Sequence, residues 1–269
     1  MVDFLPTESV AVLAMVAKPL REAQSCLLIT AIRRRGKTAV PNPTTTRALL
    51  DALLVGEPQH FCETWERGME QWRRHHSLPS QAAYVGRPDG GAACLRLVDS
   101  LGGHKGVFHA FSGENLLVTR LRVTMRPVEC DVNGAVGYVM LCGPGAATDD
   151  EISAHILPDF MGSPTFHRDH GGPITLAWLQ ANPGVGNNIG IPLVEEAECK
   201  WYTVDARIHR DSTVDVSVDG QTILQGVAFK HRPLSWLHLY NYSGGISRIG
   251  ELEVWYERAA PNQVWGRAP

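Results

Sequence analysis

The clearest pattern in the chain is an alternation of apolar and polar residues in its C-terminal third. Apolar side chains occupy every second position in residues 202–208 and again in residues 214–218. A period of two is that of a β-strand with one buried face. Asp219-Gly220 follows the second run and predicts a tight turn between antiparallel strands. This region is therefore predicted to belong to an antiparallel β-sandwich.

The same reasoning places further strands along the chain. In residues 117–126, the alternation puts Leu117, Leu121 and Met125 on one face, and Val118 and Arg120 on the other. Asn133-Gly134 predicts a type I′ hairpin between this strand and a strand at residues 135–142. Other strands are expected near residues 174–180, 201–209, 213–218, 223–230, 236–242 and 249–256. Residues 143–173 lack this alternation of apolar and polar residues and are expected to form a long loop.

Residues 1–56 have a helical pattern instead. Helices are expected from Thr7 to about Lys18, from Pro19 to Arg35, and from Thr44 or Thr45 to Gly56. The predicted organisation is a helical motif at 1–56, a β-sandwich at 57–258 and a tail at 259–269. Three short helices bury little apolar surface alone, so they should either dock on a partner or cap an edge of the sandwich.

Composition narrows the possible partners. The net charge of −3 over 269 residues disfavours binding to a nucleic-acid backbone. The six cysteines contain no CxxC pair, which argues against a zinc knuckle or a thioredoxin-type motif and favours buried free thiols. Neither a long apolar span nor a secretory n-region is found. We expect a soluble, intracellular protein, cytoplasmic or nuclear, with no membrane partner and no cofactor.

Two stretches carry a family resemblance. The segments WYTVDARI, STVDVSVDGQTI and ISRIGELEVWY resemble concanavalin A-like and laminin-G-like jelly rolls. Trp65, Glu66, Gly68 and Trp72 are similar to the F-E-x-G…W opening of many such domains. The resemblance implies a mainly β jelly roll, in a superfamily that includes lectins, glycan hydrolases and adhesion modules. Fold alone does not select among these functions.

The hydrolase alternative rests on Glu129 and Asp131. The segment E-C-D-V-N resembles the E-x-D-x-E strand of one group of concanavalin-like glycan hydrolases, in which two carboxyl groups act as nucleophile and acid. Position 133 is Asn, however, so the second acid of the motif is missing. Asn133-Gly134 is also strong turn chemistry, which is the simpler interpretation.

Other candidate sites are weaker patterns. His167, Asp169 and His170 crowd one segment and could hold a divalent metal, although solvated loop residues are the commoner outcome. Trp201 and Trp255 fall out of phase with the inward residues of their strands, so they are the tryptophans expected to be exposed and to bind ligand. No GxSxG, GxxxxGK[ST] or HExxH motif is present.

The N-terminus resembles the opening of an F-box. Leu5, Pro6 and Glu8 match its L-P-x-E start, and this resemblance implies docking on a Skp1-type adaptor. The segment departs from the family because it lacks the tryptophan of the second half of the motif. The alternative is a helical cap on the sandwich.

Together these patterns predict a non-catalytic recognition or docking protein. Its β-sandwich would bind a protein or a glycan, and its helices would recruit an adaptor. The alternatives are a carbohydrate-active enzyme on the same fold and a structural subunit of a larger assembly.

Overall fold

A computed structural model describes residues 28–32, 55–75, 78, 80–98, 106–113, 115–144, 160–181 and 188–259. By its internal contacts the chain divides into two units, residues 1–58 with 257–263 and residues 59–256 with 264–269. In the first unit, residues 28–32 form a helix with Leu28 and Ile32 buried, inside the helix expected at 19–35. The other expected helices, and Leu5, Pro6 and Glu8, lie outside the described residues.

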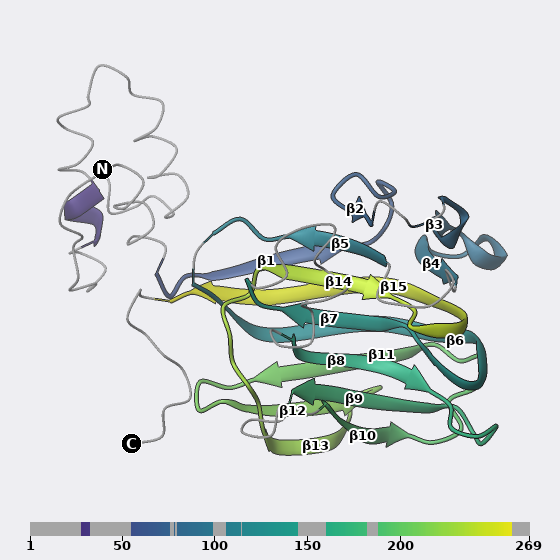
Figure 1. Cartoon of the computed structure of the whole chain (residues 1–269). Coiled ribbons are helices and arrows are strands. Elements are labelled where there is room, and N and C mark those ends of the chain that lie inside the picture. The colour runs from purple at the N-terminus through teal and green to yellow at the C-terminus, as the bar shows by residue number, and fades with distance from the viewer. Residues whose placement is uncertain are drawn as a thin grey trace. The chain divides into compact units, whose positions relative to one another are not determined.

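The second unit is built almost entirely of strands (Figure 1). The strands of its first half are β1 (Pro58–Glu63), β2 (Arg73–Arg74), β3 (Ala83–Gly86), β4 (Cys94–Val98), β5 (Gly106–Ala110), β6 (Leu116–Val136) and β7 (Tyr138–Cys142). Those of its second half are β8 (Phe160–His167), β9 (Thr175–Ala181), β10 (Asn188–Val194), β11 (Tyr202–Ile208), β12 (Thr213–Val218), β13 (Gln221–Ala228), β14 (Trp236–Tyr240) and β15 (Ser243–Arg258). Two 3-10 turns, η3 (Ser80–Ala82) and η4 (Pro88–Gly90), flank β3.

The paired strands form one continuous network of two layers, which are joined where the end of β6 pairs with β8. The first sheet has the order β13-β12-β11-β6-β15, with β1 and β4 on the far side of β15 and β3 beyond β4. The second sheet has the order β10-β9-β8-β7-β14-β5-β2. Every pairing with a described register in these sheets is antiparallel. The antiparallel jelly-roll sandwich predicted from the sequence is confirmed.

The main core lies between the sheets. Leu121 and Val204 of the first sheet join Leu141 and Leu239 of the second in one cluster of fully buried side chains. The predicted alternation holds from Leu121 to Met125, but it fails at Val118, which belongs to the core cluster rather than to the polar face. The predicted turn at Asp219-Gly220 is also confirmed, because both residues have positive φ and join β12 to β13.

Trp65 and Trp72, which carry the resemblance to the jelly-roll opening, have a structural role. Glu63 is buried and accepts hydrogen bonds from the Trp65 backbone N–H (2.7 Å) and from Trp72 Nε1 (2.8 Å). Trp65 Nε1 donates to the carbonyl of Gly250 in β15 (2.6 Å), and the two indoles stack with centroids 5.2 Å apart. These contacts tie the start of the sandwich to the strand that closes it.

The hairpin predicted at Asn133-Gly134 is wrong. β6 continues to Val136, where it leaves the first sheet and pairs with β8, while β7 pairs with β8 and β14. Gly134 does not have a positive φ; the positive-φ glycine is Gly137, three residues later. Gly134 is needed because a Cβ there would lie 2.8 Å from the carbonyl oxygen of Gly244. The glycine therefore permits a close approach of two strands.

The long loop predicted at residues 143–173 is also wrong in its second half, which contains β8. The pattern is hidden because every residue from Phe160 to Phe166 is buried, so polar residues do not alternate with apolar ones. Pro164 in a central strand adds to the difficulty. It is tolerated because β8 changes partner nearby, from β7 at Gly162 to β6 at Phe166.

Candidate functional site

The outer side of the first sheet is polar and accessible. We call it the charged face, and its members alternate with core residues on four adjacent strands. They are His60 and Cys62 of β1; Glu251, Glu253 and Trp255 of β15; Arg120, Arg122 and Thr124 of β6; and Thr203, Asp205 and Arg207 of β11. Each is exposed or half-buried.

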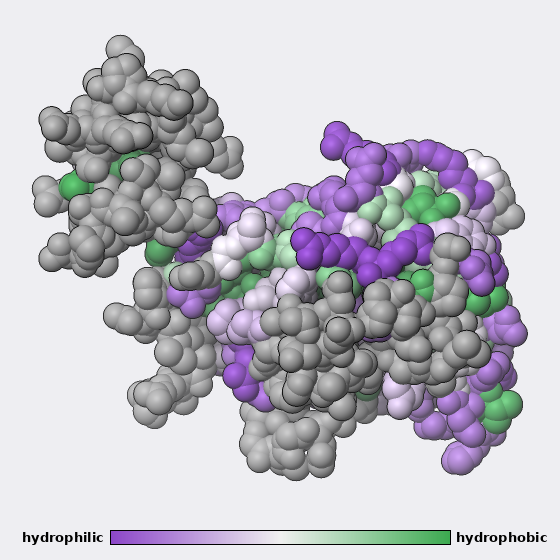
Figure 2. All heavy atoms as spheres, turned by 45° about the horizontal axis from the view of Figure 1, so that its top comes forward, coloured by the Kyte–Doolittle hydropathy of each residue, from purple (hydrophilic) through white to green (hydrophobic). Residues whose placement is uncertain are grey.

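The second sheet offers no comparable polar face in the part of the chain that is described. Its side away from the main core carries a second apolar cluster, in which Phe108, Met140, Cys142, Phe160 and Tyr240 are each at most 2% exposed. Because they are buried, these side chains are not accessible to a ligand. On the side of the molecule shown in Figure 2, the coloured hydrophobic residues form small patches between hydrophilic ones.

Ion pairs order the side chains of the charged face. Arg120 binds Asp205 with two hydrogen bonds, from Nε to Oδ1 (2.8 Å) and from Nη2 to Oδ2 (2.5 Å). The hydrogen bond to Asp205 raises the pKa of Arg120. Glu253 faces two partners, His60 Nε2 at 3.1 Å and Arg122 Nη1 at 3.4 Å. Bidentate pairing fixes the position of a guanidinium better than a single contact does.

The two tryptophans predicted to be exposed have different surroundings. Trp255 is half-buried: the His60 ring stacks on it at 4.5 Å and Arg120 Cζ lies 4.5 Å from its centroid. Because β15 lies between β1 and β6, these neighbours cover opposite faces of the indole. A sugar could stack on Trp255 only after one of them moved away.

Trp201 is placed differently, just before β11. It is 38% exposed, and its ring packs over the backbone of Gly250, where a Cβ would lie 3.3 Å from Cζ3. Thr124 lies beside the same glycine, and its hydroxyl is 3.5 Å from that of Thr203. Because Gly250 has no side chain, the indole can pack directly on the backbone of β15.

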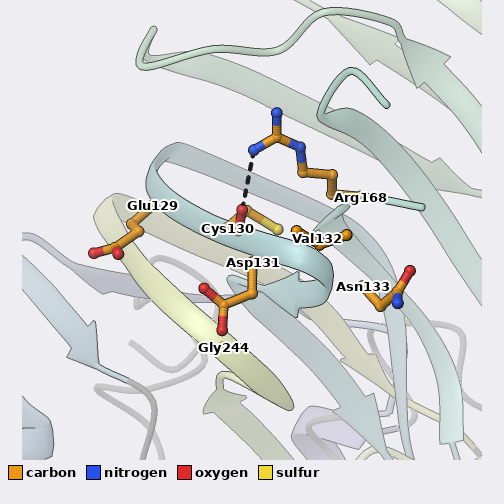
Figure 3. A pocket seen from close by; sticks show the side chains of 7 residues that line it. All are labelled: Glu129, Cys130, Asp131, Val132, Asn133, Arg168 and Gly244. Atoms are coloured by element: carbon orange, nitrogen blue, oxygen red, sulfur yellow. Dashed lines mark hydrogen bonds between the residues drawn. The ribbon is translucent and has the colours of Figure 1, made fainter. Parts of the chain in front are cut away.

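A separate cleft of about 640 Å³ lies where β6 bends between the sheets (Figure 3). Glu129, Asp131 and Asn133 all line it, together with Arg168 and Gly244. Asp131 lies against Gly244 of β15, and the guanidinium of Arg168 lies on the other side of the bent strand. Glu129 and Asp131 therefore line the same cleft, but they lie on a strand bend and not on a regular strand.

Arg168 is a lining residue that sequence reasoning missed. Its Nε donates to the Gly172 carbonyl (2.7 Å) and its Nη1 to the Cys130 carbonyl (3.3 Å), so it ties the segment after β8 to the bend. Burial raises the pKa of the Cys130 thiol to about 11, which leaves it protonated and unreactive at neutral pH. Arg168 lies between His167 and Asp169 in the sequence, and the pattern of that segment indicated a metal site and not a role for the arginine.

The proposed metal ligands of that segment do not converge. His167 Nε2 lies 3.4 Å from Asp169 Oδ1, but the His170 backbone N–H donates to Asn133 Oδ1 (2.8 Å). His170 and Gly171 both have positive φ and form the turn after β8. Within the described residues, the group whose ligand atoms do converge is Cys62 with Glu251 and Glu253.

The cysteines follow the prediction of buried thiols only in part. Cys94, Cys130 and Cys142 are buried, but Cys62 and Cys199 are exposed, and Cys26 lies outside the described residues. Strand alternation explains Cys62, which shares the outward phase of β1 with His60. No helix in the described part of the chain is long and apolar enough to cross a membrane.

Comparison with known proteins identifies the fold. Neither a family model nor a curated protein sequence matches the chain. Among solved structures, the globular domain of T. cruzi calreticulin is similar, with 14% identity over 72% of this chain and 87% of that one and a TM-score of 0.52. A cellulose-induced protein (8% identity, 72% and 96% covered, TM-score 0.46) and an alginate lyase from Pseudomonas aeruginosa (12%, 66% and 87%, 0.45) are more distant. At these identities the similarity concerns the fold alone.

Proposed function

We propose that the sandwich is a non-catalytic recognition module that binds a glycan on the charged face, with Trp201 as the stacking platform. One observation carries this proposal: the indole of Trp201 lies on the backbone of Gly250 and remains 38% exposed. A rigid aromatic plane of this kind contributes contact area at a low entropic cost.

Polar groups beside the platform support sugar recognition. The hydroxyls of Thr124 and Thr203 and the guanidinium of Arg122 lie on the same face as Trp201. Sites for polar ligands combine an apolar contact with a few fixed donors and acceptors. The ion pairs of Arg120 and Glu253 restrict the neighbouring side chains and so lower the cost of ordering them on binding.

The test compares the loss of two aromatic side chains that have the same fractional exposure. Trp201→Ala should weaken binding to glycans identified on an array at least about tenfold, as expected for a central aromatic contact. Tyr84→Ala is the matched control, because Tyr84 in β3 is also 38% exposed and lies outside the charged face. Equal glycan binding by the two variants would contradict the proposal.

The cleft at the β6 bend favours a second candidate function, glycan hydrolysis, because Glu129 and Asp131 line it together. A hydrolase would release reducing ends from a glycan panel and lose this activity in Glu129→Gln and Asp131→Asn. We expect no release by the unmodified chain, since Asn133 stands where a second acid would be needed and a retaining mechanism requires two acids about 5 Å apart.

For the N-terminal segment the proposal rests on sequence. We infer that Leu5, Pro6 and Glu8 open an F-box-like motif that docks on a Skp1-type adaptor. In this scheme the sandwich selects a glycan-bearing protein and the helices deliver it to a ubiquitin ligase.

A further inference from the structure

Three potential metal ligands meet on the charged face, beside the glycan platform but not part of it. Cys62 lies on β1, and Glu251 and Glu253 lie two residues apart on the adjacent strand β15. Cys62 Sγ and one carboxylate oxygen from each glutamate all lie within 4.8 Å of one another. Alternation along each strand puts Cys62, Glu251 and Glu253 on the outer side of the sheet, so the two strands hold this arrangement.

We propose that Cys62, Glu251 and Glu253 form a Zn²⁺ site. The donor set of one sulfur and two carboxylates fits a borderline-soft ion, because Ca²⁺ and Mg²⁺ prefer oxygen ligands alone. The set mixes three side chains of two chemical kinds from two strands, which distinguishes it from a surface cluster of acids. Binding would release the thiol proton to solvent as the sulfur coordinates.

Two neighbours hold the Glu253 carboxylate in position. His60 Nε2 lies 3.1 Å from Oε1 and Arg122 Nη1 lies 3.4 Å from Oε2. Each carboxylate oxygen has two lone pairs, so it can accept a hydrogen bond and still coordinate a metal. Outer partners of this kind orient metal ligands in established sites.

The charges also balance. A thiolate and two carboxylates carry three negative charges, which Zn²⁺ and the nearby Arg122 together neutralise. Three protein ligands leave one tetrahedral position for water or for an external donor. Since Cys62 and Glu251 are exposed, that fourth position opens toward solvent on the charged face.

Cobalt spectroscopy of the full chain tests this site. Co²⁺ should produce a thiolate-to-metal charge-transfer absorption that equimolar Zn²⁺ abolishes by competition. Cys62→Ser should remove the absorption, and Glu251→Gln should weaken Co²⁺ affinity at least about tenfold. Cys199→Ser is the matched control, because Cys199 is the other exposed cysteine of the described residues and should leave the spectrum unchanged.

A second readout does not depend on a spectrum. Zn²⁺ should slow alkylation of Cys62 by iodoacetamide, measured by peptide mapping, while Cys199 in the same chain reacts at an unchanged rate. An absent charge-transfer band in the unmodified chain, a band that persists in Cys62→Ser, or equal alkylation of Cys62 with and without Zn²⁺ would each overturn the proposal. Thermal unfolding without metal confirms that every variant is folded.

Discussion

Trp201 and Trp255 show how neighbours decide what a side chain can do. Both were expected on the outer side of the sheet from their phase, and both lie there. The His60 ring and the Arg120 guanidinium cover Trp255, whereas Gly250 supports Trp201 from below. The position of a residue within the alternation of a strand predicts the side of the sheet on which its side chain lies. It does not predict the residues that flank an aromatic ring, because these come from strands distant in sequence.

His231 provides a prediction about pH. Burial lowers its pKa from 6.5 to about 4, and its ring contacts Phe229 edge-on with centroids 5.6 Å apart. The unfolded chain therefore binds this proton at a higher pH than the folded chain does. The free energy of unfolding should fall as the pH drops from about 6.5 to about 4, by up to about 3 kcal/mol.

Denaturant unfolding at a series of pH values measures this effect. His231→Gln should flatten the decline between pH 6.5 and 4. A residual slope of the same sign should remain because burial also lowers the pKa of His109. A variant that keeps the whole of the original slope would show that His231 is not the group responsible.

At the scale of elements, β6 organises the molecule because it pairs in both sheets. Its first half pairs with β11 at residues 120–125, and its end pairs with β8 at Ala135 and Val136. The bend between these halves creates the cleft that contains Glu129 and Asp131. At this bend Gly134 lies close to the backbone of β15 at Gly244.

Gly134→Ala tests the close approach at this bend. The added Cβ would lie 2.8 Å from the Gly244 carbonyl oxygen and 2.9 Å from the Asp131 nitrogen, both backbone atoms that cannot rotate away. We expect a loss of about 1–3 kcal/mol in the free energy of unfolding, measured by urea denaturation.

Gly86→Ala is the control for this substitution, since its Cβ would meet only Tyr84 Cε2, at an ordinary 3.8 Å. That variant should stay within about 0.5 kcal/mol of the parent. If Gly134→Ala were equally harmless, the bend would tolerate a wider separation of the strands than the structure shows.

Alternation of apolar and polar residues made β12 predictable from the sequence, and β14 is predicted within 236–242 although four of its five residues are buried. β12 was placed at its observed bounds because valine alternates with polar residues there. β8 was missed because both of its faces are buried, and β10 was missed as well. The cleft residues Glu129 and Asp131 could be named from a motif, whereas Arg168 enters the site through a pairing that no local pattern encodes.

At the scale of the whole molecule, the two sheets are unequal. The second sheet buries apolar side chains on both sides, and the first exposes ion pairs and hydroxyls. This difference is why we propose the first sheet as the recognition surface. The charged face combines an aromatic platform and a candidate Zn²⁺ site on adjacent strands.

The helical segment gives a prediction that spans the whole chain. A Skp1-type adaptor should co-purify with the full chain but not with residues 57–269, nor with a full-length Leu5→Ala, Pro6→Ala variant. Leucine and proline at the opening would supply the apolar contacts of the docked helices. Recovery of the adaptor with residues 57–269 would show that the contact lies elsewhere, and no recovery with the full chain would remove the F-box interpretation.

Glycan binding at Trp201 can be followed through the tryptophan indole N–H resonances of a ¹⁵N-labelled full chain during titration with a glycan selected on an array. We expect the Trp201 resonance to shift with the binding curve, while those of the buried Trp65 and Trp178 stay fixed. A glycan that binds with no change at Trp201, and instead perturbs backbone resonances around Glu129 and Arg168, would rule out Trp201 as the platform and place recognition in the cleft.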